Sequence, residues 1–133
     1  MSELTAPPPW TVGPITRTEI VRYQGASGDF NPIHHDEPFA TGAGYPAPLG
    51  IGMLHAGLMN TWAVKWLGPA NVRRTRVRWK APVFPGDVLT FSGSVERQLT
   101  SDSGEARVEI SLVCAKADGT IAATGLMEFA RPG

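Results

Sequence analysis

Residues 52–67 form an apolar segment that constrains the fold more than any other stretch of this chain. Most of these residues are nonpolar, and the polar exceptions, such as His55, Asn60 and Lys65, leave little polar face. Gly68 and Pro69 follow, and this pair ends a helix. A helix of about 15 residues that is hydrophobic nearly all round is normally a buried one. The rest of the chain must therefore build a structure that surrounds it.

Beyond Asn71 the hydrophobic periodicity changes from that of a helix to that of a strand. Within residues 72–80, basic side chains alternate with Thr75, Val77 and Trp79, which places the two sets on opposite faces. Turn residues then separate three more expected strands, at 88–95, 106–116 and 121–130. We expect the four strands to form an antiparallel meander wrapped around the apolar helix, an α+β fold.

The segment before the apolar helix is expected to contain two shorter helices. Thr16 and Glu19 have the spacing of a capping box, which predicts a helix at 17–26. Its inner or pocket-facing side is expected to carry Ile20, Val21, Tyr23 and Gln24. Asp36 is a natural N-cap for a second helix that runs to Gly42.

The length of the chain indicates one domain. Residues 1–9 are a polar, proline-ended arm that we expect to be flexible, and residues 10–133 are expected to form the single folded domain. The only cysteine, Cys114, excludes an internal disulfide, and its apolar neighbours predict a buried thiol.

The composition argues against several classes of partner. A formal net charge of +0 gives no general attraction to nucleic acid. No window is long and apolar enough for a membrane span, and the N-terminus has no basic region followed by an apolar one, as a signal peptide requires. We therefore expect a cytoplasmic protein without nucleic-acid or membrane partners.

The residues best suited to chemistry lie in the loop at 29–35. Asp29 and His34 are separated by Phe-Asn-Pro-Ile, so a carboxylate and an imidazole share one short, proline-stiffened loop. Such a pair can act as general acid and base, or it can merely close the loop through hydrogen bonds. His35 and Asp36 add two more metal-binding side-chain types, but successive side chains point in different directions and Asp36 suits a helix cap. No metal site is expected.

The pattern Tyr-x-x-x-Ser-Gly-Asp-x-Asn-Pro-Ile-His at residues 23–34 resembles the signature of MaoC-like (R)-specific enoyl-CoA hydratases and 3-hydroxyacyl dehydratases. The resemblance extends to Gly-Met-Leu at 52–54 and to the segment 78–87, and it covers most of residues 12–130. It departs at Ile51, where members of the family often carry histidine. The resemblance implies a hot-dog fold, in which a long antiparallel sheet wraps around a central helix.

The resemblance also implies roles for individual residues. Asp29 and His34 would be the catalytic dyad that handles a water molecule, with the division between acid and base left open. Gly52 would bind the substrate, because an amide without a neighbouring Cβ at a helix N-terminus can approach the thioester oxygen; a glycine also suits tight packing alone. Met53 would line the acyl tunnel or belong to the core. Asn31 would line the pocket, although bracing of the loop is the favoured interpretation.

The implied reaction is the addition of water to a trans-2-enoyl thioester, or its removal from an (R)-3-hydroxyacyl thioester, in fatty-acid or related acyl metabolism. No cofactor is expected, since coenzyme A or acyl carrier protein enters as part of the substrate. An exposed sheet edge and an unfinished pocket predict a homodimer. A heterodimer with a related hot-dog subunit is an alternative.

A non-catalytic acyl-binding or thioesterase-like protein is the remaining alternative. Hot-dog thioesterases typically place an acidic residue on the main helix, and residues 53–67 contain none. Two other features stay open. His55 is expected to be an interior or interface histidine. The basic residues at 73–80 fit a solvated strand face, or a patch that attracts the phosphates of coenzyme A or an acidic carrier protein.

Overall fold

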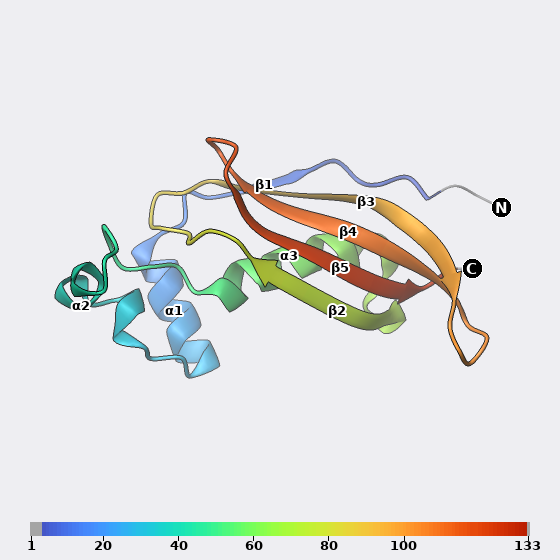
Figure 1. Cartoon of the computed structure of the whole chain (residues 1–133), viewed down its shortest axis with the longest axis horizontal. Coiled ribbons are helices and arrows are strands. Elements are labelled where there is room, and N and C mark those ends of the chain that lie inside the picture. The colour runs from blue at the N-terminus through green and yellow to red at the C-terminus, as the bar shows by residue number, and fades with distance from the viewer. Residues whose placement is uncertain (1–3, 133) are drawn as a thin grey trace.

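The computed structural model describes residues 4–132, so residues 1–3 of the expected arm and residue 133 of the expected domain lie outside the described part. The elements, in chain order, are β1 (Trp10–Val12), α1 (Arg17–Ser27), the 3₁₀ turn η1 (Pro32–His34), α2 (Glu37–Gly42), α3 (Gly52–Leu67), the 3₁₀ turn η2 (Pro69–Asn71), β2 (Val72–Trp79), β3 (Leu89–Thr100), β4 (Ala106–Lys116) and β5 (Ile121–Ala130). A single five-stranded antiparallel sheet lies along α3, and α1 and α2 lie beyond the end at which α3 begins (Figure 1). This arrangement confirms the predicted α+β hot-dog fold.

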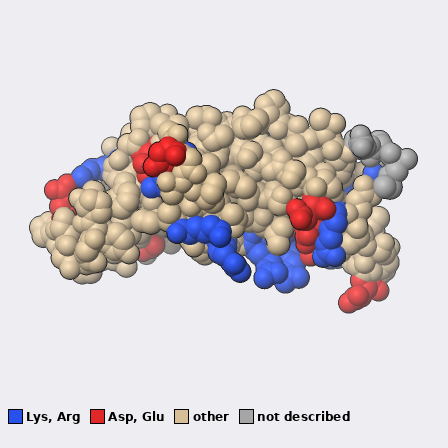
Figure 2. Space-filling model, turned by 45° about the horizontal axis from the view of Figure 1, so that its top comes forward, with Lys and Arg blue, Asp and Glu red and all other residues tan. Residues whose placement is uncertain are grey.

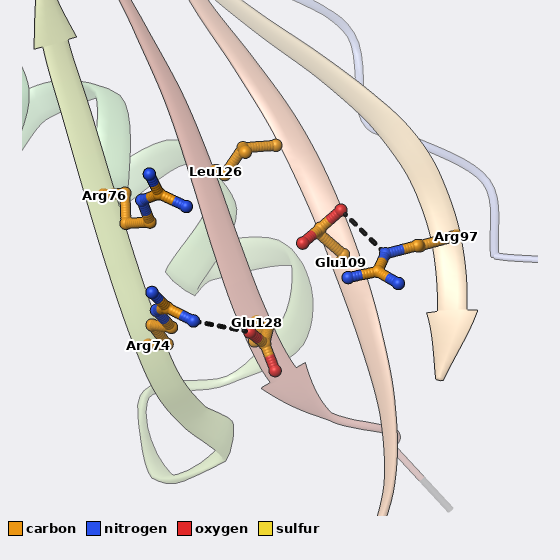
Figure 3. Close-up of a pocket in the computed structure, with 6 residues that line it drawn as sticks. All are labelled: Arg74, Arg76, Arg97, Glu109, Leu126 and Glu128. Carbon is orange, nitrogen blue, oxygen red and sulfur yellow. Dashed lines mark hydrogen bonds and ion pairs between the residues drawn. The ribbon is translucent and has the colours of Figure 1, made fainter. Parts of the chain in front are cut away.

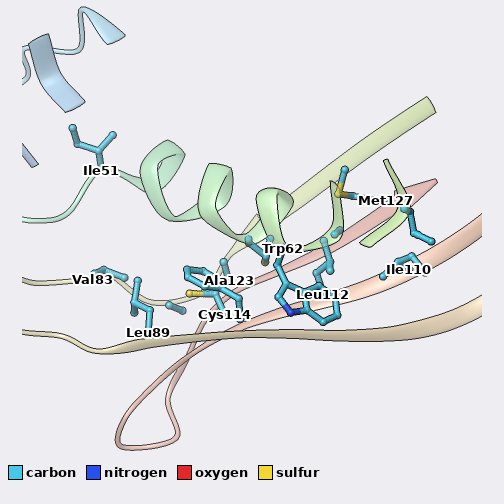
Figure 4. Close-up of a cluster of buried hydrophobic side chains, with 14 of the residues drawn as sticks. Ile51, Trp62, Val83, Leu89, Ile110, Leu112, Cys114, Ala123 and Met127 are labelled. Atoms are coloured by element: carbon cyan, nitrogen blue, oxygen red, sulfur yellow. The ribbon is translucent and has the colours of Figure 1, made fainter. Parts of the chain in front are cut away.

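The core lies between α3 and one face of the sheet. On β4 every second side chain is buried, as expected for a strand with one covered face. These β4 side chains meet residues of α3, β3 and β5 in one cluster that includes Met59, Trp62, Phe91, Val108, Ile110, Leu112, Cys114, Ala123, Met127 and Phe129 (Figure 4). Cys114 is fully buried, as its apolar neighbours predict.

Two glycines let α3 approach the sheet closely. Gly93 of β3 and Gly125 of β5 both pair with Leu112 of β4, so the two glycines lie on either side of this leucine in the sheet. A Cβ on Gly125 would lie 2.8 Å from the methyl carbon of Met59, and one on Gly93 would lie 3.0 Å from the ring of Trp62. The absence of these side chains therefore makes room for Met59 and Trp62 of α3.

The sheet covers only one side of α3. His55, Ala56, Met59, Trp62, Ala63 and Leu67 are buried. Leu54, Leu58 and Trp66 are only partly buried, and Met53 is 58% exposed. A single sheet can contact one face of a helix, so the apolar residues on the other face keep access to solvent in one copy of the chain.

The four long strands are not a simple meander, which corrects the prediction. The sheet order is β1-β3-β4-β5-β2, so β2 pairs with β5 at the far edge instead of with β3. Four- and five-residue turns join β4 to β5 and β3 to β4, whereas nine residues with two prolines, 80–88, connect β2 to β3. Tight hairpins need short loops, so only β3, β4 and β5 follow one another in the sheet.

The expected short helices are present, with differences in detail. Thr16 caps α1 by accepting a hydrogen bond from the Glu19 amide at 3.0 Å, and Asp36 caps α2. In a capping box the Glu19 carboxylate would accept a hydrogen bond from the backbone amide of Thr16. Here it accepts one from the Thr16 hydroxyl instead. Val21 is 52% exposed, so the inward alternative for it is wrong, while a position toward the pocket stays a prediction: α1 lies beyond the sheet and buries only the stripe of Ile20 and Gln24.

The described part of the N-terminal arm lies against the core. Leu4 and Ala6 pack on the core cluster, and the Pro8 carbonyl accepts a hydrogen bond from the Trp62 indole at 3.0 Å. The flexibility of the arm stays a prediction. Within residues 4–132, none of the helices has the length and apolar character needed to cross a membrane.

Candidate active site

The loop that carries Asp29 is shaped by the end of α1. Gly28 adopts a left-handed conformation (φ 77°), and its amide donates to the Gln24 carbonyl at 2.9 Å, so the chain leaves the helix in a sharp turn. The Oδ1 of Asp29 then accepts from the Asn31 amide at 3.3 Å. One carboxylate oxygen of Asp29 is thus used within the loop, and the other, Oδ2, lies near the His34 ring.

His34 lies at the end of the 3₁₀ turn η1, and its ring is fixed on one side. Nδ1 is 3.0 Å from the Leu49 carbonyl oxygen. A carbonyl only accepts, so Nδ1 carries the hydrogen in the neutral ring and Nε2 keeps a free lone pair. The His34 side chain is 11% exposed, and its Nε2 lies 3.7 Å from Oδ2 of Asp29, whose side chain is 45% exposed.

This spacing suits a bound water. At 3.7 Å the two atoms are too far apart for a direct hydrogen bond, yet a water oxygen can lie about 2.8 Å from both. The structure therefore brings the two predicted catalytic side chains together, with the unprotonated ring nitrogen and a carboxylate oxygen 3.7 Å apart. Their catalytic roles stay predictions.

The start of α3 is tied to the same loop. The Leu49 amide donates to the Ile33 carbonyl at 3.0 Å, and the Leu49 carbonyl receives the His34 ring. Helix α3 begins three residues later at Gly52, and Ile51 provides no side-chain cap. The first-turn amides of α3 consequently have no side-chain acceptor, and they follow closely along the chain after Leu49, which holds the His34 ring.

Gly52 is required by packing, whatever else it does. The Trp79 indole donates to the Gly52 carbonyl at 2.9 Å. A Cβ at position 52 would lie only 2.7 Å from that indole nitrogen, so no larger residue fits without moving Trp79. This supports the packing interpretation of the glycine, while substrate contact by its amide stays a prediction. Met53 next to it is 58% exposed and is not a core residue in the single chain.

Asn31 braces the loop. Its side-chain oxygen accepts from the Ile33 amide at 3.0 Å and caps η1, and Pro32 occupies the first position of the turn. Bracing was the favoured interpretation from sequence, and these contacts support it. A direct contact between Asn31 and a substrate stays a prediction.

Gln24, which the sequence places on the inner or pocket-facing side of the helix without a role, is a member of the site. It is 3% exposed, and its side chain hydrogen-bonds to Asp29, Asn31 and His35. The available signal was a long polar residue four positions after the buried Ile20, on the inner stripe of a short helix.

Among the other titratable residues considered from sequence, His35 bonds to Gln24 and Asp36 caps α2. Within residues 4–132 no group of three or more histidine, cysteine or acidic residues could hold a metal ion. His55 is 4% exposed, and its Nε2 has no hydrogen-bond partner there. Burial, and then the charge of Lys116, lower the pKa of His55 from 6.5 to about 4.

The basic residues of β2 lie along one long side of the molecule (Figure 2). Near the end of β2 that follows η2, Arg74 is 3.9 Å from Glu128 of β5, and on the neighbouring strands Arg97 of β3 is 3.1 Å from Glu109 of β4 (Figure 3). Arg76, Arg78 and Lys80 line a groove of about 500 Å³ that contains neither Asp29 nor His34. The solvated-face interpretation fits the paired end, and the carrier-binding interpretation stays a prediction for the groove.

The model of the MaoC-like domain family matches residues 6–114. The 3-hydroxyacyl-thioester dehydratase Y of Mycobacterium tuberculosis is 38% identical over 79 residues, which are 56% of this chain and 27% of that protein. The peroxisomal enoyl-CoA hydratase 2 of Arabidopsis thaliana is 36% identical over 66 residues, 47% of this chain and 21% of that protein. The chain thus spans about a quarter of the length of these relatives.

Solved structures share the fold over nearly the whole chain. An (R)-hydratase from A. caviae involved in PHA biosynthesis superposes with a TM-score of 0.80 at 24% identity, covering 99% of this chain and 100% of that one. A chain from the ChsH1-ChsH2 complex of Mycobacterium tuberculosis gives a TM-score of 0.81 at 24% identity, with 99% and 100% covered. At this level of identity, the likeness extends to the fold alone.

Proposed function

The chain belongs to the family of MaoC-like domains, and we propose on this premise that it is a hydro-lyase acting on acyl thioesters. It adds water to a trans-2-enoyl thioester or removes water from a 3-hydroxyacyl thioester. The observation that carries the proposal is the 3.7 Å separation of His34 Nε2 and Asp29 Oδ2, two polar atoms able to hold one water. The hydratase and dehydratase named among the relatives support the same reaction class.

In the hydration direction, the dyad activates the water. His34 Nε2 has the free lone pair and takes one proton as the water oxygen bonds to C3. The Leu49 carbonyl holds the opposite side of the ring, and the Asp29 carboxylate stabilises the imidazolium that forms. One proton is returned to C2, so the pair ends in its starting protonation state. The direction of net flux depends on the substrate supplied.

The negative charge that develops on the thioester oxygen needs a separate stabiliser. The N-terminal turn of α3, which begins at Gly52 close along the chain to Leu49, has amides without a side-chain cap. Free amides and the positive end of a helix dipole favour an oxyanion. We assign this role to the first turn of α3. The same helix carries no carboxylate in residues 53–67, which disfavours the thioesterase-like alternative.

A crotonyl-CoA hydration assay with purified protein tests the proposal. Asp29→Asn and His34→Ala should each lower kcat by about 10²- to 10⁴-fold, the usual effect of losing a general acid or base. Asp118→Asn is a matched control, because Asp118 accepts from the Thr120 amide in the β4–β5 turn and has no part in the dyad. A near-normal rate in either dyad variant would remove the pair from the mechanism.

We further propose that the chain works as a homodimer. The face of α3 with the partly buried Leu54, Leu58 and Trp66, and the unpaired outer edge of β2, both need a cover that one copy does not provide. A heterodimer with a related subunit is the alternative, in line with the two-component complex named among the similar structures. Light scattering at micromolar concentration distinguishes the cases. A stable monomer contradicts the homodimer, and activity only after adding a second chain favours the heterodimer.

A further inference from the structure

Gln24 is one of two buried polar side chains within residues 4–132, the other being His55. It lies on the inner stripe of α1, and all of its side-chain hydrogen bonds go to the loop at residues 29–35. Nε2 donates to the Asp29 carbonyl at 3.0 Å and to the Asn31 carbonyl at 3.3 Å, and Oε1 lies 3.1 Å from Nδ1 of His35. The amide thus uses both of its hydrogens and its oxygen in one loop.

These bonds define the orientation of the amide and of its histidine partner. Two carbonyl oxygens can only accept, so the nitrogen of the Gln24 amide must face them. The amide oxygen then faces His35, whose Nδ1 must carry the hydrogen. A glutamate at this position would place an oxygen against the two carbonyls, and an apolar residue would leave all three groups without this partner.

The three contacts bracket the dyad. The Gln24 side chain binds the backbone carbonyl of Asp29. His34 lies in the chain between Asn31 and His35, which Gln24 also binds. Each dyad side chain has its own hydrogen bond, the His34 ring to the Leu49 carbonyl and the Asp29 carboxylate from the Asn31 amide, and the Asp29 amide donates to the Ser27 hydroxyl. In the described part of the chain, no other side chain outside the loop bonds to both of its ends.

We propose that Gln24 is a positioning residue that sets the separation between the Asp29 carboxylate and the His34 imidazole. This inference rests on the proposed hydro-lyase function. Gln24 touches neither the water nor the thioester in this account; it acts by holding the backbone on either side of the two reacting groups. A displacement of about 1 Å in such a pair can lower a rate about 10²-fold, so the loss should appear in kcat while the substrate still binds.

Gln24→Met and Gln24→Glu test this in the crotonyl-CoA assay. Both keep the length of the side chain; the first removes all three bonds, and the second removes the two donors. We expect kcat to fall about 10- to 100-fold with KM unchanged within about twofold. Thr16→Ala is the matched control, because it removes the N-cap of the same helix without touching the loop. It should lower the Tm and leave kcat unchanged.

Two outcomes would overturn the inference. In one, folded Gln24→Met has a kcat within twofold of the unsubstituted protein. In the other, Thr16→Ala lowers kcat as much as Gln24→Met does, which would make Gln24 a contributor to helix stability only.

Nitrogen-15 NMR of the histidine rings gives a readout that does not need activity. The unsubstituted protein should show His35 in the Nδ1–H form at neutral pH, and Gln24→Met should shift the His35 and His34 ring signals while Thr16→Ala leaves them in place. Unmoved His34 signals in Gln24→Met refute the positioning role even if no substrate is turned over. Absence of hydration by the unsubstituted protein, with the ring shifts as expected, would refute the proposed function and not the positioning geometry.

Discussion

Lowering the pH should destabilise the chain through His55. Its pKa is lowered from 6.5 to about 4 in the folded chain, by burial first and then by the charge of Lys116. Between these values the unfolded chain binds a proton at this residue and the folded chain does not, so the free energy of unfolding falls as the pH falls. At 1.36 kcal/mol per pKa unit, the full difference is about 3 kcal/mol.

The loss develops over a defined range. Linkage from the two pKa values gives almost no contribution at pH 7, about 2 kcal/mol of lost stability at pH 5 and about 3 kcal/mol at pH 4. Urea unfolding of the unsubstituted protein and of His55→Met, at each pH, isolates this contribution, because carboxylates titrate alike in both. Methionine suits a helix and a buried site. The stability of His55→Met relative to the unsubstituted protein should rise by these amounts as the pH is lowered.

The reasoning fails if the two proteins lose stability in parallel from pH 7 to pH 4. That result would mean that His55 protonates as easily in the folded chain as in the unfolded one, and that its unpartnered Nε2 is not isolated from water. Proton NMR of the His55 ring gives the folded pKa directly, and a value near 6.5 would refute the same argument.

Three other substitutions or modifications test the packing. Gly93→Ala should lower the free energy of unfolding by about 1–3 kcal/mol in a urea titration, because the new Cβ would lie 2.4 Å from the Ser111 carbonyl oxygen; an unchanged midpoint contradicts this. Burial raises the pKa of the Cys114 thiol from 9.0 to about 11, so a thiol reagent at pH 8 should label it only on unfolding, and rapid labelling of folded protein would disagree. Gly52→Ala should lower the Tm strongly alone and much less in a Trp79→Leu background, whereas additive effects would mean that the indole contact is not the constraint.

The fold was predictable from sequence wherever one periodicity continued long enough. The alternation along β4 predicts a strand with one covered face, and the apolar run of α3 predicts a buried helix. The place of β2 was not predictable in this way, because strand partners depend on where the chain crosses the sheet. The nine-residue connection at 80–88 was the available hint, since a hairpin would have used fewer.

The candidate site was predictable as a set of residue types but not as a geometry. The spacing of Asp29 and His34 in the chain indicated a pair, and the structure adds that the Leu49 carbonyl orients the ring. That contact joins residues 15 positions apart, and no local pattern encodes it. The inner position of Gln24 was predictable, but its role was not, because the role comes from hydrogen bonds to the loop folded against the helix.

The sheet order has a consequence for the sequence of events in folding. β3, β4 and β5 are joined by short turns and can pair through local contacts, whereas the outer strands β1 and β2 join the two opposite edges and are linked by the crossover that contains α1, η1, α2 and α3. Local pairings close quickly and distant ones slowly. We therefore expect the central hairpins to form early and the crossover to order late. The loop with Asp29 and His34 lies in that crossover, so the part of the chain proposed to do the chemistry would be completed last.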